Sequence, residues 1–118
     1  MSFDLILKEL TKNAGAKGAV MLDSDGEIVA SHADSPSLEI DLIGAHHGIV
    51  LDIIKDATSR SAFSGVRSVA ISTVKSRLAI STLKEGYYLL VAMGRSAPMG
   101  KALFESRRAV ERIEEEMG

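Results

Sequence analysis

The chain has 118 residues, of which 46% are hydrophobic and 25% are charged. This length and composition are typical of one globular domain, here expected over residues 1–118, and exclude a low-complexity chain. Fourteen Lys and Arg residues against sixteen Asp and Glu residues leave a net charge of −2, which argues against nucleic acid as the main partner. The sequence has no Cys, so it offers no disulfide or thiolate metal site, and a cytoplasmic location is expected.

The first segment has the pattern of a short amphipathic helix. Apolar residues recur at helical spacing from Phe3 to Leu10, Ser2 is placed to cap the start, and Gly15 is placed to end the helix. The segment lacks the basic and apolar regions of a signal peptide, and no apolar run approaches the ~18 residues that span a bilayer. We therefore expect no membrane insertion.

Two short apolar segments, 18–22 and 27–30, flank the sequence Asp23-Ser24-Asp25-Gly26. An Asp-Gly pair supplies the positive-φ residue that tight hairpin turns need, so the segment predicts a β-hairpin. The three acidic residues from Asp23 to Glu27 also suggest a calcium loop, but that motif needs Gly at its sixth position and Glu at its twelfth. The spacing here has neither, and no metal site is expected.

The segment from Ser37 to Ser59 predicts a long helix, entered through Pro36. Placed at ~100° intervals, its apolar residues cover well over half of the circumference, whereas a helix on one sheet needs a stripe only a little over ~100° wide. A second copy of the chain would bury the surplus, which predicts a homodimer. The candidate dimer-interface residues are Leu38, Leu42, Ile43, His47, Val50 and Ile54. The pattern leaves open which sector faces the sheet and which the partner.

Histidine offers no metal site by spacing. His46 and His47 are adjacent on the predicted helix, so their side chains point about 100° apart and cannot chelate one ion, and His32 is remote in sequence. We expect packed or interfacial histidines. If His47 faces the partner chain, the dimer would be sensitive to mild acid.

The second half predicts three strands and a closing helix. Segments 66–74 and 77–83 form a hairpin across Lys75-Ser76, Glu85-Gly86 is a turn, and Tyr87 to Met93 is a continuous apolar run of the kind that fills a central strand. A helix follows with one apolar face, made of Met99, Ala102, Leu103, Ser106, Ala109, Val110, Ile113 and Met117.

The predicted order is therefore helix, two strands, helix, three strands, helix. It indicates an α/β (α+β) fold with a five-stranded antiparallel sheet and flanking helices. The order, together with segments 18–30, 83–92 and 94–100, resembles the roadblock/dynein-light-chain family from Phe3 to about Met117. Profilin-like and longin-like folds share this architecture.

The resemblance implies a function as well as a fold. Members of the family form homodimers in which the long helices pack together and the sheets join at an edge, and bacterial members act on Ras-like GTPases. It implies that this chain is a non-enzymatic homodimeric regulator or scaffold of a Ras-like small GTPase, without a cofactor. The alternatives are a structural assembly subunit with no effect on GTP hydrolysis, or a small-ligand sensor domain of profilin-like or longin-like fold.

The nearest approach to a nucleotide motif is the segment from Gly94 to Ala102. A phosphate loop has four residues between its glycines, free backbone N–H groups and a hydroxyl residue after its Lys. This segment has five residues between Gly94 and Gly100, a proline at Pro98, and Ala102 in place of the hydroxyl residue. The interpretation favoured instead has Ser96 as a helix cap, Pro98 in the first turn and an exposed Lys101.

Catalytic machinery is not evident elsewhere. The sequence has no Gly-x-Ser-x-Gly elbow. Arg107, Arg108 and Arg112 raise the possibility of an arginine finger. However, Glu105, Glu111 and Glu115 alternate with them at spacings of three and four, which is typical of a solvated helix face. We therefore expect no catalytic, cofactor or metal residues.

Overall fold

A computed structural model describes residues 2–35, 43, 56 and 66–118. The long helix predicted at 37–59 lies outside these residues, apart from Ile43 and Asp56. The elements are α1 (Phe3–Ala14), β1 (Gly18–Leu22), β2 (Ile28–Ala33), β3 (Ser68–Ser72), β4 (Ser76–Thr82), the 3₁₀ turn η1 (Lys84–Gly86), β5 (Tyr88–Gly94) and α3 (Met99–Met117). Their order confirms the prediction for this part of the chain.

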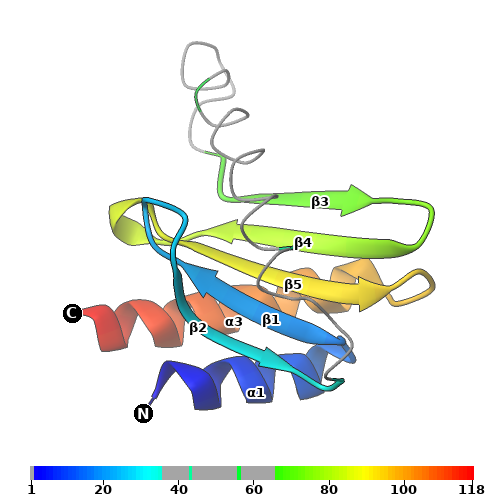
Figure 1. The fold of residues 1–118 in the computed structure, drawn as a ribbon, viewed down its shortest axis with the longest axis horizontal. Coiled ribbons are helices and arrows are strands. Elements are labelled where there is room, and N and C mark those ends of the chain that lie inside the picture. Colours follow the sequence, from blue (N-terminus) through cyan, green and yellow to red (C-terminus); the bar gives the residue numbers. More distant parts are fainter. Residues whose placement is uncertain (1, 36–42, 44–55, 57–65) are drawn as a thin grey trace.

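The five strands form one sheet in the order β2-β1-β5-β4-β3, and every neighbouring pair is antiparallel. This confirms the predicted fold class. Strand β5 lies in the centre, as its continuous apolar run predicted, and its side chains are buried from Tyr88 to Met93. Strands β2 and β3 form the two edges of the sheet (Figure 1).

Helices α1 and α3 lie side by side on one face of the sheet (Figure 1). Alternate side chains of β1 and β5 point toward them, and α1 contributes Ile6, Leu7 and Leu10 to this helix-side core. Strands β1 and β5 contribute Ala19, Met21, Leu89, Val91 and Met93, and α3 contributes Ala102, Ala109 and Ile113.

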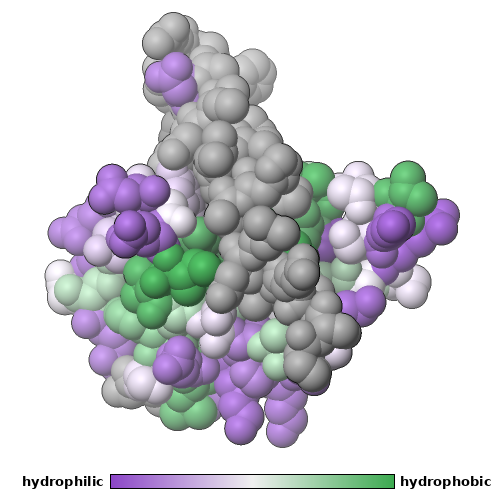
Figure 2. Space-filling model, in the orientation of Figure 1, coloured by the Kyte–Doolittle hydropathy of each residue, from purple (hydrophilic) through white to green (hydrophobic). Residues whose placement is uncertain are grey.

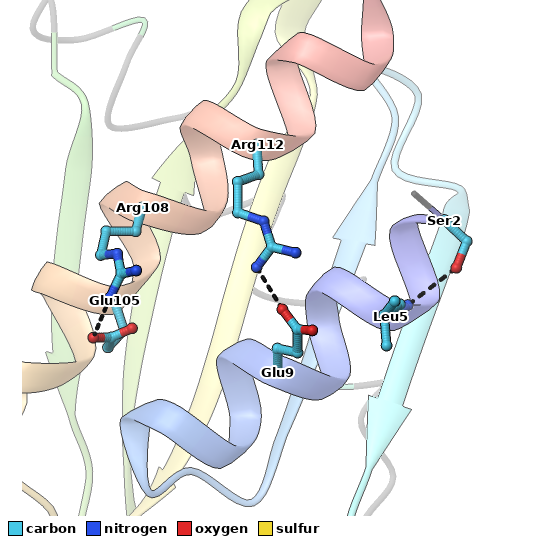
Figure 3. Close-up of polar contacts among 6 residues, drawn as sticks. All are labelled: Ser2, Leu5, Glu9, Glu105, Arg108 and Arg112. Carbon is cyan, nitrogen blue, oxygen red and sulfur yellow. Dashed lines mark hydrogen bonds and ion pairs between the residues drawn. The ribbon is translucent and has the colours of Figure 1, made fainter.

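Helix α1 begins and ends where its sequence predicts. The Ser2 hydroxyl accepts a hydrogen bond from the Leu5 N–H at 3.3 Å (Figure 3). Gly15 has φ 65°, a left-handed conformation that favours glycine, and its N–H donates to the Lys12 carbonyl. Each end of the helix therefore has a local cap that satisfies one of its free backbone groups.

Strand boundaries differ from the sequence prediction by one residue in β4 and β5, and by more than one in β2 and β3. Strand β2 continues to Ala33 rather than ending at Ala30, because Ser31, His32 and Ala33 pair with β1 although their side chains lack strand character. Strand β3 is shorter than predicted and spans only Ser68–Ser72. Pairing with a neighbour, and not local composition, sets both limits.

No helix in the described part of the chain is long and apolar enough to cross a membrane.

Candidate functional site

The opposite face of the sheet carries a second apolar cluster. It consists of Val20, Leu22, Leu78, Ile80, Tyr88, Leu90 and Ala92, all buried, with Val69 and Ile71 of β3 packed against it. Ile43 is half-buried and also packs against this cluster. Figure 2 shows this side of the molecule, with hydrophobic side chains visible on it.

Ile43 is the one predicted interface residue within the described chain. Leu38, Leu42, His47, Val50 and Ile54 lie outside it, as does His46. The structure therefore places the Ile43 side chain on the sheet face that α1 and α3 leave free.

The hydrogen bonds between β3 and β4 determine which backbone groups of β3 point toward β4 and which point away from it. The Thr82 N–H donates to the Arg67 carbonyl and the Thr73 N–H to the Ser76 carbonyl, both at 2.8 Å. Because bonded pairs alternate along an antiparallel ladder, the odd-numbered residues of β3 bond to β4. The N–H and C=O groups of its even-numbered residues are directed toward the free edge of the sheet: Ser68, Ala70 and Ser72.

The acidic turn between β1 and β2 is a hairpin, as predicted. The Asp23 carboxylate accepts hydrogen bonds from the Asp25 and Glu27 N–H groups at 2.9 and 3.0 Å, and Gly26 has φ 83°. This carboxylate holds the turn together. In the part of the chain that the structure describes, no group of three or more His, Asp or Glu residues is placed to hold a metal ion.

The segment before α3 corrects one prediction. Ser96 does not cap the helix, because α3 begins at Met99 with Pro98 at the N-cap position and no side-chain cap. The Ala97 N–H donates to the Gly94 carbonyl at 3.2 Å, and the Arg77 guanidinium donates to the Ala97 carbonyl at 3.0 Å. A tight turn held by Arg77 replaces the expected cap, while Lys101 is exposed as expected.

The arginines of α3 have separate roles (Figure 3). Arg108 pairs with Glu105 one turn earlier at 3.4 Å, as its spacing predicted. Arg112 instead reaches across to Glu9 of α1, with an N–O distance of 2.6 Å. The spacing of residues along one helix could not predict this pair, because its members are 103 positions apart. Arg107 is exposed beside a groove.

That groove lies between α3 and strands β3 and β4, with a volume of about 720 Å³. Its apolar wall is Leu83, Leu103 and Val110, and its charged residues are of both signs. The Glu114 carboxylate accepts a hydrogen bond from the Lys84 N–H at 2.8 Å and is thereby held on the groove wall. Among the described residues, the lining includes Ser and Thr hydroxyls but no His to act as a base.

Charged side chains are segregated between the two ends of the strands. One end holds the β3–β4 turn, the β5–α3 turn and the C-terminus of α1. Its described charged residues are Lys12, Lys17, Lys75, Arg77, Arg95 and Lys101, against the carboxylate of Asp34. The described residues at the other end are Asp4, Asp23, Asp25, Glu27, Glu85, Glu111, Glu114, Glu115 and Glu116, against Arg67, Lys84 and Arg112. The described part of the protein is therefore cationic at one end and acidic at the other.

A sequence profile described as the Roadblock/LC7 domain matches residues 2–93. The chain belongs to the Roadblock/LC7 family. No curated protein sequence matches this Roadblock/LC7 chain significantly.

Solved structures show how far the fold of this Roadblock/LC7 domain is shared. Myxococcus xanthus MglB is similar with a TM-score of 0.86 at 13% identity, over 98% of this chain and 94% of that one. A Roadblock/LC7 domain from Streptomyces avermitilis has a TM-score of 0.84 at 24% identity, over 97% and 96% of the two chains. Acanthamoeba castellanii profilin IB has a TM-score of 0.63 at 15% identity, over 99% and 100%. At these identities the likeness establishes the fold alone.

Proposed function

We propose that this Roadblock/LC7 chain is a non-catalytic, cytoplasmic homodimer that regulates or scaffolds a Ras-like small GTPase. The observation that carries the proposal is the family match over residues 2–93, supported by the MglB-like fold over nearly the whole chain. The resemblance to this family implies action on such a GTPase. The Asp23 carboxylate serves a turn and the pair between Arg112 and Glu9 serves helix packing, which also favours a binding role for these side chains over catalysis.

The position of Ile43 suggests how the dimer is built. On the predicted helix, His47, Val50 and Ile54 fall within about 40° of Ile43, whereas Leu42 is about 100° away and Leu38 about 140°. Since Ile43 packs on the sheet, we place its sector against the sheet. We place the sector of Leu38 and Leu42 against the partner chain.

The β3 edge supports a second contact between protomers. Its outward backbone groups form a row that a strand of another copy can pair with. This edge lies beside the face that carries Ile43, so one partner could use both surfaces. The family resemblance implies the same joining of sheets.

The test begins with a pull-down from the native host and identification of any Ras-like protein recovered. GTP hydrolysis and nucleotide exchange by that purified GTPase are then measured with and without the chain. We expect a change in one of the two rates that saturates at a fixed ratio of chain to GTPase. Binding with both rates unchanged would favour an assembly subunit, and no binding would contradict the proposal.

A further inference from the structure

The solvent-facing side of α3 has an unusual distribution of charge. Its first half exposes Lys101, Arg107 and Arg108, and its second half exposes Glu111 and Glu115. Spacings of three, four and seven residues place these side chains on one outer face of the helix. The face is therefore positive at its beginning and negative at its end.

An exposed aromatic ring lies within the positive half. Phe104 is 61% exposed, although Phe is usually buried. Lys101 precedes it by three residues, and Arg107 and Arg108 follow it by three and four, so all three cations are its neighbours on the helix surface. The ring and the cations together form a compact patch.

Helix stability does not account for this arrangement. The dipole of a helix favours acidic residues in the first turn and basic residues in the last, and α3 has neither. Its outer charges follow the opposite order. Among the described residues, Lys101 and Arg107 form no ion pair, and the pair between Arg108 and Glu105 is long, at 3.4 Å. The charges of Lys101 and Arg107 are thus available to a partner, while Arg108 is held only by this long pair.

We propose that the outer face of α3 binds the same face of a second copy of the chain, with the two helices antiparallel. In this arrangement the positive half of each helix meets the negative half of the other. A two-fold register places Arg107 and Arg108 near Glu111 of the second copy, and Phe104 against the stem of Glu115 of that copy. The face is therefore complementary to itself, as a two-fold contact requires.

This contact is separate from the dimer proposed above. It uses α3, on the opposite side of the sheet from Ile43, so a chain that dimerises through Ile43's face would form tetramers through α3. The paired stretch from residue 101 to 115 is only about 21 Å long, so the contact is small and weak by itself. Exposed ion pairs weaken with salt, so the association should weaken too.

Two charge-reversal variants of the full chain test the proposal. In Arg107→Glu/Arg108→Glu the face is acidic along most of its length, and in Glu111→Arg/Glu115→Arg it is basic. Sedimentation velocity over roughly 10 to 500 µM protein, at low and at about 0.5 M salt, measures each association step. Circular dichroism checks that each variant is folded.

We expect wild-type protein to show a concentration-dependent step that about 0.5 M salt abolishes. In each variant alone, the affinity of this association step should fall by about tenfold. A 1:1 mixture of the two variants should restore it. Phe104→Ser should weaken it by about fivefold. Leu5→Ser and Lys8→Glu are the controls, because they make an apolar-to-polar change and a charge reversal at exposed residues of α1. They should leave the association step unchanged.

Two results would overturn the proposal: variants that self-associate like wild type, or a mixture that fails to recover the step. If the dimer on the sheet face that carries Ile43 did not form, the result would be different: the species at the lowest protein concentration would be a monomer in every sample. The two contacts therefore fail independently in this experiment.

Discussion

Ser106 places a hydroxyl on the buried face of α3. The residue is 1% exposed, and its Oγ has no hydrogen-bond partner among the described residues. A buried, unpaired hydroxyl costs about 1–3 kcal/mol, and Ala is also the better helix former by about 0.5 kcal/mol. We predict that Ser106→Ala raises the free energy of unfolding by about 1 kcal/mol, measured by urea denaturation.

Thr11 of α1 provides the matched comparison. It is also buried, but its hydroxyl donates to the Leu7 carbonyl at 2.8 Å. Thr11→Val keeps the shape and removes a hydrogen bond that is made, so it should lower the free energy of unfolding by about 0.5–1 kcal/mol. Changes of the same sign in both variants would mean that packing, and not hydrogen bonding, decides their stability.

Turn chemistry at single residues was predictable only where the signal was local. Asp23 and Gly26 form the predicted hairpin because a short side chain and a positive φ act within the turn itself. Ser96 also lies in a suitable position for a helix cap, but Arg77 arrives from β4 and holds a different turn. A contact between distant segments leaves no local signal.

The pair between Arg112 and Glu9 connects α3 to α1 at their exposed margin. The two side chains are 35% and 41% exposed, so solvent screens the pair and the distance of 2.6 Å does not imply a large stabilisation. We predict a coupling free energy of about 0.5 kcal/mol in a double-mutant cycle of Glu9→Gln and Arg112→Gln. The value should fall in about 0.5 M salt, and a coupling that salt leaves unchanged would contradict this account.

The edge strand β3 offers a direct test of sheet pairing between protomers. Ala70 is exposed, and its N–H is directed away from β4. Ala70→Pro removes an outward donor and keeps the bonds to β4, so we predict loss of dimer with a folded protomer. Light scattering coupled to size exclusion measures the mass. Ala70→Ser retains the N–H and should remain dimeric.

At the scale of elements, amphipathic periodicity correctly predicted α1 and α3, and the continuous apolar run predicted the central position of β5. The predicted face of α3 is confirmed, with Ala102, Ser106, Ala109 and Ile113 buried. Strand ends were less predictable, because β2 extends through polar residues by pairing with β1. The interface residues proposed for the long helix stay a prediction, apart from the position of Ile43 on the sheet.

For the whole molecule, substitutions at the adjacent residues Leu42 and Ile43 should have different effects, one on dimerisation and the other on folding. Ile43 packs on the sheet, so Ile43→Asp should bury a charge and destabilise the protomer by more than about 2 kcal/mol. We predict that Leu42→Asp, one position away, instead yields folded monomers. Urea denaturation and light scattering distinguish the two effects. A stable dimer of Leu42→Asp would contradict the assignment of sectors on the long helix.

The separation of charge along the strands gives the described part of each protomer a permanent dipole moment, although the net charge of the chain is only −2. Antiparallel pairing at β3 would set two such moments in opposite directions, so that they cancel. The cationic end of one protomer would then lie beside the acidic end of its partner. Dimerisation would thus remove the dipolar part of the field, by which a lone protomer orients other charged molecules, while the net charges of the two protomers add.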